Sequence, residues 1–148
     1  MEELINTLKD ADDCQRLADV FSELAKKARL RSVVLRAQKH GYKTRVESEL
    51  AKAIYAYEDI LTLNNKRKTH ATRTWQMVKR YGIIKAAEKA VNRPVETMGY
   101  RILIERGMSD LTFESVITQY PKEFSKDIVK LAKNRLEELE LKLAHFGQ

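Results

Sequence analysis

A basic segment between Lys66 and Arg93 carries the side chains best suited to bind phosphate. It holds nine cations against a single anion, Glu88, so its net charge is +8. Lysine and arginine at this density neutralise the phosphates of nucleic acids and release their counterions. The nine cations are Lys66, Arg67, Lys68, Arg73, Lys79, Arg80, Lys85, Lys89 and Arg93. Because threonines at 69, 72 and 74 add hydroxyl donors, the segment predicts contacts to a phosphate backbone.

Charge is segregated along the rest of the chain. Residues 26–45 form a second basic block with eight cations and no carboxylate before Glu47. The first 25 residues hold seven acidic and two basic residues, a net charge of −5, whereas the whole chain carries +7. Segregated charge produces a local field even when the total charge is modest. We therefore expect the 26–45 block to assist the 66–93 segment.

Residues 75–106 have the spacing of a helix-turn-helix, in which a second helix enters the major groove of DNA. The apolar positions of 83–91 predict the first helix of the pair, and "NRP" predicts the turn. The following helix, 95–106, would read base edges, while Arg93 and the amides after Pro94 would hold a phosphate. The residues expected to point outward from this helix are Glu96, Thr97, Tyr100 and Arg101. Glu96 would repel phosphate, and short paired helices also occur in all-α domains that bind no nucleic acid.

The same residues have plainer interpretations. The loop 64–72 could be solvated and have no ligand. Trp75 and Tyr81 could stack on bases, as aromatic residues do beside cations in proteins that bind single strands. However, Trp75, Val78 and Tyr81 share one helical face, which favours core packing for Trp75. The two basic blocks also leave opposite ends of the predicted hairpin, so the sequence leaves open whether they form one patch.

Signals for catalysis or metal binding are weak. The histidines at 40, 70 and 145 are scattered, and the chain has no HExxH, CxxC or P-loop pattern. No nucleophile–base pair can be nominated. We therefore expect no enzyme activity, no metal and no cofactor. The one cysteine, Cys14, cannot form an internal disulfide, and the start of the chain lacks the pattern of a signal peptide.

The period of the apolar residues is helical nearly throughout. Leu17, Phe21, Leu24 and Ala28 form one stripe, and Val46, Leu50, Ile54 and Leu61 form another. With Gly41 between them, these two helices predict a long antiparallel hairpin over residues 1–63. Shorter apolar faces follow over 72–81, 83–91, 95–106 and 109–119, and a long helix begins at Ser125 and continues to His145.

The predicted fold is therefore all-α, with about seven or eight helices and no strands. One domain over 1–148 would hold the hairpin, a compact group of short helices over 72–148 and a long C-terminal helix. No apolar run approaches the length of a membrane span, so we expect a cytoplasmic protein that is not bound to a membrane.

The function that these patterns favour is nucleic-acid binding, with double-stranded DNA preferred over RNA. The alternative is a protein-interaction or adaptor module that uses charged helical faces. Its acidic and basic blocks could pair between two copies in a homodimer, or with an acidic protein partner. Salt dependence separates the two functions, because phosphate binding weakens steeply with salt and an apolar interface does not.

Overall fold

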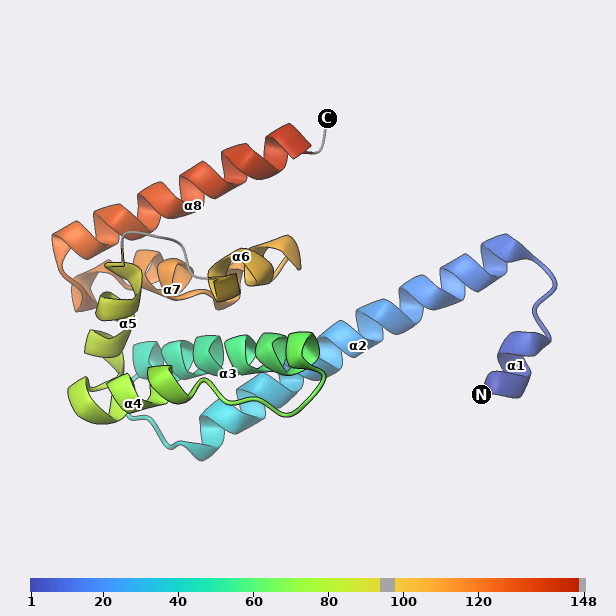
Figure 1. The fold of residues 1–148 in the computed structure, drawn as a ribbon, viewed down its shortest axis with the longest axis horizontal. Helices are drawn as coiled ribbons and strands as arrows, with labels where there is room; N and C mark the ends of the chain where they lie inside the picture. Colours follow the sequence, from blue (N-terminus) through green and yellow to red (C-terminus); the bar gives the residue numbers. More distant parts are fainter. Residues whose placement is uncertain (94–97, 147–148) are drawn as a thin grey trace.

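The computed structural model describes residues 1–93 and 98–146 and is helical throughout, with no strand among these residues. The all-α prediction of about eight helices is confirmed. Two short 3₁₀-helices, η1 and η2, separate the last three α-helices (Figure 1). The elements are α1 (Glu2–Asn6), α2 (Ala11–Lys39), α3 (Arg45–Asn65), α4 (Thr72–Tyr81), α5 (Ile83–Val91), α6 (Met98–Glu105), η1 (Ser109–Leu111), α7 (Phe113–Gln119), η2 (Pro121–Glu123) and α8 (Lys126–Phe146).

Local sequence signals explain the hairpin of α2 and α3. Asp10 caps α2 by accepting a hydrogen bond from the Asp12 amide, and Gly41 adopts a φ of 65° in the turn that follows α2. Thr44 and Glu47 form a capping box, in which each side chain accepts a hydrogen bond from the backbone of the other residue. These caps stop one helix and start the next within a few residues, which reverses the chain.

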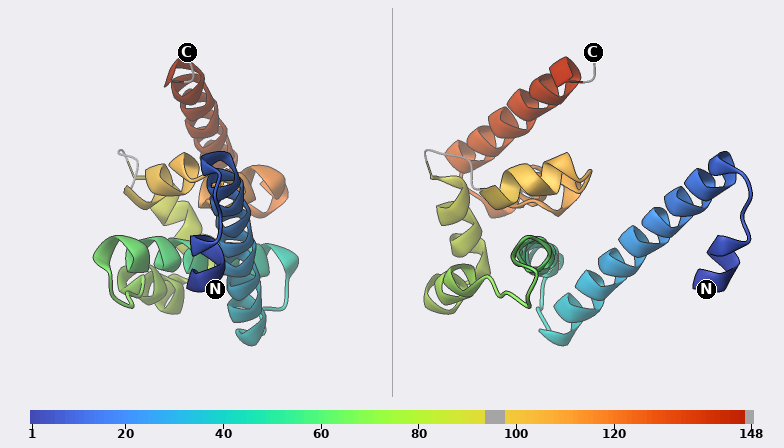
Figure 2. Two further views of the ribbon diagram at one scale, coloured as in Figure 1. Left: turned by 90° about the vertical axis from the view of Figure 1, so that its right-hand side faces the viewer. Right: turned by 45° about the vertical axis from the view of Figure 1, so that its right-hand side comes forward.

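Only the C-terminal part of α2 packs in this hairpin. Val33 is the first buried residue of the chain, and Ala37 is the only other buried residue of α2. The part of α2 before Val33 projects away from the other helices together with α1 (Figures 1 and 2). The predicted hairpin therefore forms, but the stripe from Leu17 to Ala28 lies outside it.

The core is built around α3, which contacts α2, α5, α6 and α7. Leu50 and Ile54 on α3 are fully buried and belong to one apolar cluster with residues of α5, α7 and α8, among them Val91, Ile117 and Ala132. Helix α3 is thus the scaffold on which the short helices of the second half are arranged.

Tight turns separate the short helices. Gly82, at a φ of 83°, lies between α4 and α5 and lets the chain change direction without a break in packing. The side chain of Thr112 caps α7 by accepting a hydrogen bond from the Ser115 amide. Ser109, which the sequence placed at the start of this helix, instead begins η1. None of the helices in the described ranges is long and apolar enough to cross a membrane.

Candidate nucleic-acid interface

The basic loop 66–71 runs back along α3 to the start of α4, and hydrogen bonds fix its course (Figure 1). Lys66 ends α3 in the left-handed conformation, at a φ of 53°. The Thr69 amide donates to Thr62 Oγ1 at 3.0 Å, and Thr62 Oγ1 donates to the Thr69 carbonyl at 3.3 Å. The loop is therefore tied to α3 by its own backbone, and its lysines and arginine at 66–68 remain exposed.

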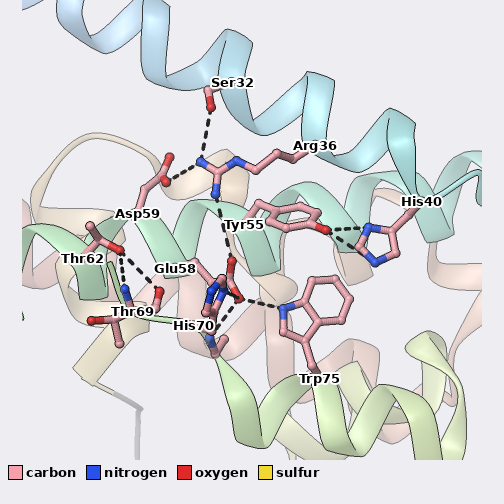
Figure 3. A network of polar contacts seen from close by, with 11 residues as sticks. Ser32, Arg36, His40, Tyr55, Glu58, Asp59, Thr62, Thr69, His70 and Trp75 are labelled. Carbon is pink, nitrogen blue, oxygen red and sulfur yellow. Dashed lines mark hydrogen bonds and ion pairs between the residues drawn. The ribbon is translucent and has the colours of Figure 1, made fainter. Parts of the chain in front are cut away.

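The carboxylate of Glu58 holds the end of this loop (Figure 3). Glu58 is on α3 and is only 3% exposed. Its Oε1 atom accepts hydrogen bonds from the Ala71 amide at 2.9 Å and from Trp75 Nε1 at 2.7 Å. Arg36 Nη1 lies 4.0 Å from Oε2 of this carboxylate, and His70 Nδ1 lies 3.5 Å from Oε1. Because a buried carboxylate must be satisfied by donors and cations, this one fixes the position of everything that contacts it.

Stacked rings join α4 to the tip of the α2–α3 hairpin. The ring of His40 stacks on Trp75, with centroids 4.9 Å apart and an interplanar angle of 7°. On the hairpin itself, His40 also stacks on Tyr42 at 5.4 Å, and its Nδ1 is hydrogen-bonded to Tyr55 Oη at 2.5 Å. Trp75 is thus engaged by its ring and by its N–H, so it belongs to the packed structure and is not free to stack on a base.

This packing decides how the two basic blocks meet. The His40–Trp75 contact brings the tip of the hairpin against α4. Three exposed cations, Lys39, Lys43 and Arg45, lie within five residues of His40. The other end of the block, at Lys26 and Arg29, lies beside the C-terminal end of α3. The 26–45 block is therefore divided, and its tip end adjoins the 66–93 segment.

Burial and neighbouring charges shift two tyrosines of this cluster. Burial raises the pKa of Tyr42 above its ordinary value of 10.0, and Tyr55 and Glu47 raise it further. The pKa of Tyr55 is also raised, first by burial and then by the Glu58 carboxylate, although the charge of Arg36 acts in the opposite direction. Arg36 lies over the Tyr55 ring, 5.3 Å from its centroid. Both phenols are therefore neutral across the physiological range.

One face of α4 is cationic. Arg73, Gln76 and Arg80 are exposed at spacings of three and four residues on the side away from Trp75 and Val78, and Lys79 is exposed one turn after Trp75. Beside them, Tyr81 is 42% exposed and lies under two cations, with Arg80 at 5.3 Å and Lys89 at 4.5 Å from its ring centroid. This exposed ring with cations around it is the arrangement on which bases stack in proteins that bind single strands.

Glu88, the single anion of the 66–93 segment, already has partners within the protein. Glu88 pairs with Lys85 at 2.9 Å and accepts a hydrogen bond from the Ser125 amide, just before α8, at 3.2 Å. Burial alone would raise the pKa of Glu88, but these two hydrogen bonds and the charge of Lys85 outweigh it and lower the pKa below its ordinary value of 4.5. Glu88 consequently neutralises Lys85 and leaves the other cations uncompensated.

The residues predicted to bind nucleic acid differ in their exposure and ion pairing. No described carboxylate forms an ion pair with seven of them, and these seven are exposed: Lys66, Arg67, Lys68, Arg73, Lys79, Arg80 and Arg93. Lys85 is exposed but paired with Glu88. Arg101 is exposed on α6, and Thr97 lies outside the described residues.

The prediction that Tyr100 points outward is wrong. Tyr100 is 5% exposed and packs in an apolar cluster with Ile104 of α6 and Leu139 of α8. Helix α6 also contacts α3. Gly99 of α6 lies so close to the Tyr57 ring of α3 that a side chain at position 99 would overlap the ring. Of the residues predicted to read bases, Tyr100 is therefore a packing residue and Arg101 is exposed, while Glu96 lies outside the described residues. Of the predicted turn, Asn92 and Arg93 are described and Pro94 is not.

A cavity borders the exposed cations of the 66–93 segment. This cavity of about 360 Å³ lies between α3, α4, α6 and α7, and Arg73 and Arg93 are among its lining residues. Nearby, the buried Arg135 of α8 pairs with Glu114 of α7 at 3.4 Å and also donates to the carbonyl of Arg93. The bond from Arg135 fixes the backbone at Arg93, and the side chain of Arg93 stays exposed.

No family model, no curated protein and no solved structure matches the chain. The residues that sequence reasoning missed are Glu58 and His40, which position the loop and α4. A signal for Glu58 was present, since it falls on the apolar face of α3 between Ile54 and Leu61, at helical spacings of four and three.

Proposed function

We propose that this protein binds nucleic acid, with double-stranded DNA as the preferred ligand, through its basic surface. The term basic surface covers the exposed cations that have no ion pair with a described carboxylate, in the loop 66–71, on α4 and α5, at position 93 and at the hairpin tip. They are Lys66, Arg67, Lys68, Arg73, Lys79, Arg80, Lys89, Arg93, Lys39, Lys43 and Arg45. The proposal rests above all on the absence of described partner carboxylates along this surface.

The arrangement of these cations supports the proposal. Exposed lysine and arginine side chains are usually balanced by nearby carboxylates on a mixed protein surface. Here Glu58 is buried and holds the loop, and Glu88 is used by Lys85 and the Ser125 amide. The backbone beneath the cations is fixed by the Thr62–Thr69 hydrogen bonds and by Glu58, so less ordering is required when a charged polymer binds.

The contacts we propose are to phosphates rather than to base edges. Tyr100 is buried and Trp75 is engaged by His40 and Glu58, so two of the side chains suited to base contact are occupied. Arg101 and the exposed Tyr81 remain available. Phosphate contacts provide affinity without sequence information, and we accordingly expect little difference among duplexes of different sequence.

The test is fluorescence anisotropy of labelled duplex DNA, single-stranded DNA and RNA, titrated with the full chain from 50 to 200 mM salt. If about six phosphates are contacted, log K falls against log salt with a slope of about −5 for the duplex. Duplex should bind more tightly than RNA at every salt concentration. Tighter binding of the single strand would move the site to Tyr81 and its two cations and would overturn the preference for duplex.

A matched pair of variants separates the surface from the net charge. Arg73→Glu with Arg80→Glu should make the slope shallower by about 2, because two phosphate contacts are lost. Lys130→Glu with Lys133→Glu changes the net charge equally but alters exposed residues of α8, on the far side of the molecule from α4 (Figures 1 and 2). An equal loss in both variants, or no binding of any of the three ligands at 50 mM salt, would refute the proposal.

A further inference from the structure

The projecting part of the chain, residues 1–32, meets the described part of the body only near its end, where Lys26, Arg29 and Leu30 line a cavity beside α3; we call it the arm. It contains α1 and the part of α2 before Val33, and none of its residues is buried. The pictures show α2 leaving the body as a nearly straight helix, with α1 turned back at its far end (Figures 1 and 2). Most helices in proteins are stabilised by packing an apolar face, so such a face on the arm calls for a partner.

The arm has an apolar face of the required kind. Leu17, Phe21, Leu24 and Ala28 follow one another at spacings of four, three and four residues, which is the seam of a two-helix coiled coil. Phe21 is 42% exposed and Leu24 is 54% exposed, and Val20 beside them is 55% exposed. A monomer would leave this seam in water.

The seam leads into a hollow where the arm meets the body. A cavity of about 230 Å³ there is lined by Leu30 and Val33 of α2, Ile60 and Leu63 of α3, and Met108. Three cations, Lys26, Arg29 and Arg106, also line it, and its one anion, Asp59, is paired with Arg36. The hollow is therefore apolar inside and has an excess of positive charge, which suits an acidic amphipathic helix.

The arm is itself such a helix, and its charge reverses along its length. Residues 10–25 carry five carboxylates and one arginine, a net charge of −4. Residues 26–31 carry four cations and no anion, a net charge of +4. Two arms laid antiparallel would place each acidic end against the basic end of the other copy. A parallel arrangement would place like charges together, which costs stability.

We propose that two copies of this chain form a dimer by antiparallel pairing of their arms. The apolar seams face one another, and the acidic end of each arm lies over the cavity lined by Lys26, Arg29 and Arg106 in the other copy. A second copy is the occupant because one arm carries both complementary halves, which a two-fold axis brings together twice. The dimer leaves α4 and the loop 66–71 free, so it does not depend on nucleic-acid binding.

Sedimentation velocity of the full chain over a range of concentrations tests the association. The unmodified chain should reach the dimer mass, and Phe21→Glu with Leu24→Glu should weaken the dimer at least tenfold, because charges enter the seam. The control, Leu141→Glu with Leu143→Glu, alters equally exposed apolar residues of α8 and should leave the dimer unchanged. Helical circular dichroism and Trp75 fluorescence verify that each variant is folded. A chain that is monomeric at every concentration would disprove the proposal.

Charge exchange tests whether the partner is a second arm that pairs through its charges. Asp12→Lys with Asp19→Lys and Glu23→Lys makes the whole arm basic, and Lys26→Glu with Lys27→Glu and Arg29→Glu makes it acidic. Each variant alone should be monomeric, and an equal mixture should form a heterodimer. Failure of the mixture to associate would overturn the antiparallel pairing.

The exposed Cys14 gives the direction independently. With nitroxide labels on this residue, pairing centred near Val20 and Phe21 places the two label sites about 20 Å apart along the helix axis, at 1.5 Å per residue. Parallel arms would bring the two labels side by side and would allow a disulfide between the unlabelled chains. A short label distance measured by pulsed electron paramagnetic resonance would therefore contradict the proposal.

Discussion

The carboxylate of Glu58 accepts a hydrogen bond from the indole N–H of Trp75 at 2.7 Å, seventeen residues further along the chain. The same oxygen accepts the Ala71 amide, so a single atom fixes both the end of the basic loop and the first turn of α4. The side chains of the cations at 66–68 and on α4 are exposed and do not pack in the core. Their placement therefore depends on a buried acid that contacts no ligand.

Replacement of Glu58 should destabilise the fold to a degree that depends on the substitute. Glu58→Ala leaves the Ala71 and Trp75 N–H groups without their acceptor and removes one of the two carboxylates beside Arg36, which retains Asp59. The change should cost about 3–5 kcal/mol of unfolding free energy. Glu58→Gln retains one oxygen for both N–H donors and should cost about 1–2 kcal/mol. Urea unfolding followed by the fluorescence of Trp75, the single tryptophan, measures both values.

The control is Glu49→Gln on the same helix. Glu49 pairs with Lys52 at 2.7 Å, but both side chains are partly exposed, so the change should cost less than about 1 kcal/mol. Equal losses of unfolding free energy at positions 49 and 58 would show that the burial of Glu58 does not contribute to stability.

Most of the fold could be predicted because it follows from local signals. The apolar spacing of 83–91 predicted the bounds of α5, and the stripe from Val46 to Leu61 predicted α3. Acids on exposed helical faces are common, so the position of Glu58 in the sequence does not by itself distinguish it from a surface acid. Its burial depends on the return of the loop 66–71 across α3, and the spacing of apolar residues within one helix does not predict that path.

Two further features depended on tertiary packing. The stripe of Leu17, Phe21 and Leu24 has the periodicity of a buried helix face, yet the described part of this chain does not cover it. Tyr100 was assigned to the outside of a recognition helix, but α6 packs on α3 and turns Tyr100 towards Leu139. In both cases the period was identified correctly, but periodicity within one helix does not show which residues cover each face.

Alkaline pH should weaken the packing around His40. Burial raises the pKa of Tyr42 and Tyr55 above 10.0, so the unfolded chain loses these protons at lower pH than the folded one. Their contribution to stability is complete below pH 10 and is lost as the pH rises through the folded values. Tyr42 and Tyr55 should therefore ionise above pH 10 when ultraviolet absorbance is followed at 295 nm.

Tyr55→Phe identifies one of these groups. It removes the hydrogen bond to His40 together with one late-titrating phenol, and the alkaline loss of stability should become smaller. Tyr81→Phe, at an exposed ring, is the control and should leave the late titration intact. If all six tyrosines of the unmodified chain titrate together, the two phenols are not shielded as described.

Acid should weaken the junction between α5 and α8. The pKa of Glu88 is lowered because the bonds from Lys85 and the Ser125 amide outweigh burial, so the folded state favours the charged form. That stability is present above pH 4.5 and disappears as the pH falls through the folded pKa. The difference in unfolding free energy between the unmodified chain and Glu88→Gln should be constant near pH 7 and shrink below 4.5. A difference that does not change with pH would refute this role.

The buried pair of Arg135 and Glu114 should show strong coupling between α7 and α8. Both residues are less than 9% exposed, so removal of one leaves the other as a buried charge with a weakened partner set, at a cost of about 3–5 kcal/mol. Arg135→Leu with Glu114→Leu removes both charges and should cost less than the sum of the single changes, with a coupling of at least about 2 kcal/mol.

The double variant separates this pair from the second bond of Arg135. It still lacks the donor to the Arg93 carbonyl, so about 1 kcal/mol of the loss should remain even after both charges are gone. Because that carbonyl belongs to a residue of the basic surface, the same variant should also bind duplex DNA more weakly than an Ile128→Val variant of matched stability. Additive single changes would mean that the two charges are independently solvated and that α7 and α8 are held by apolar packing alone.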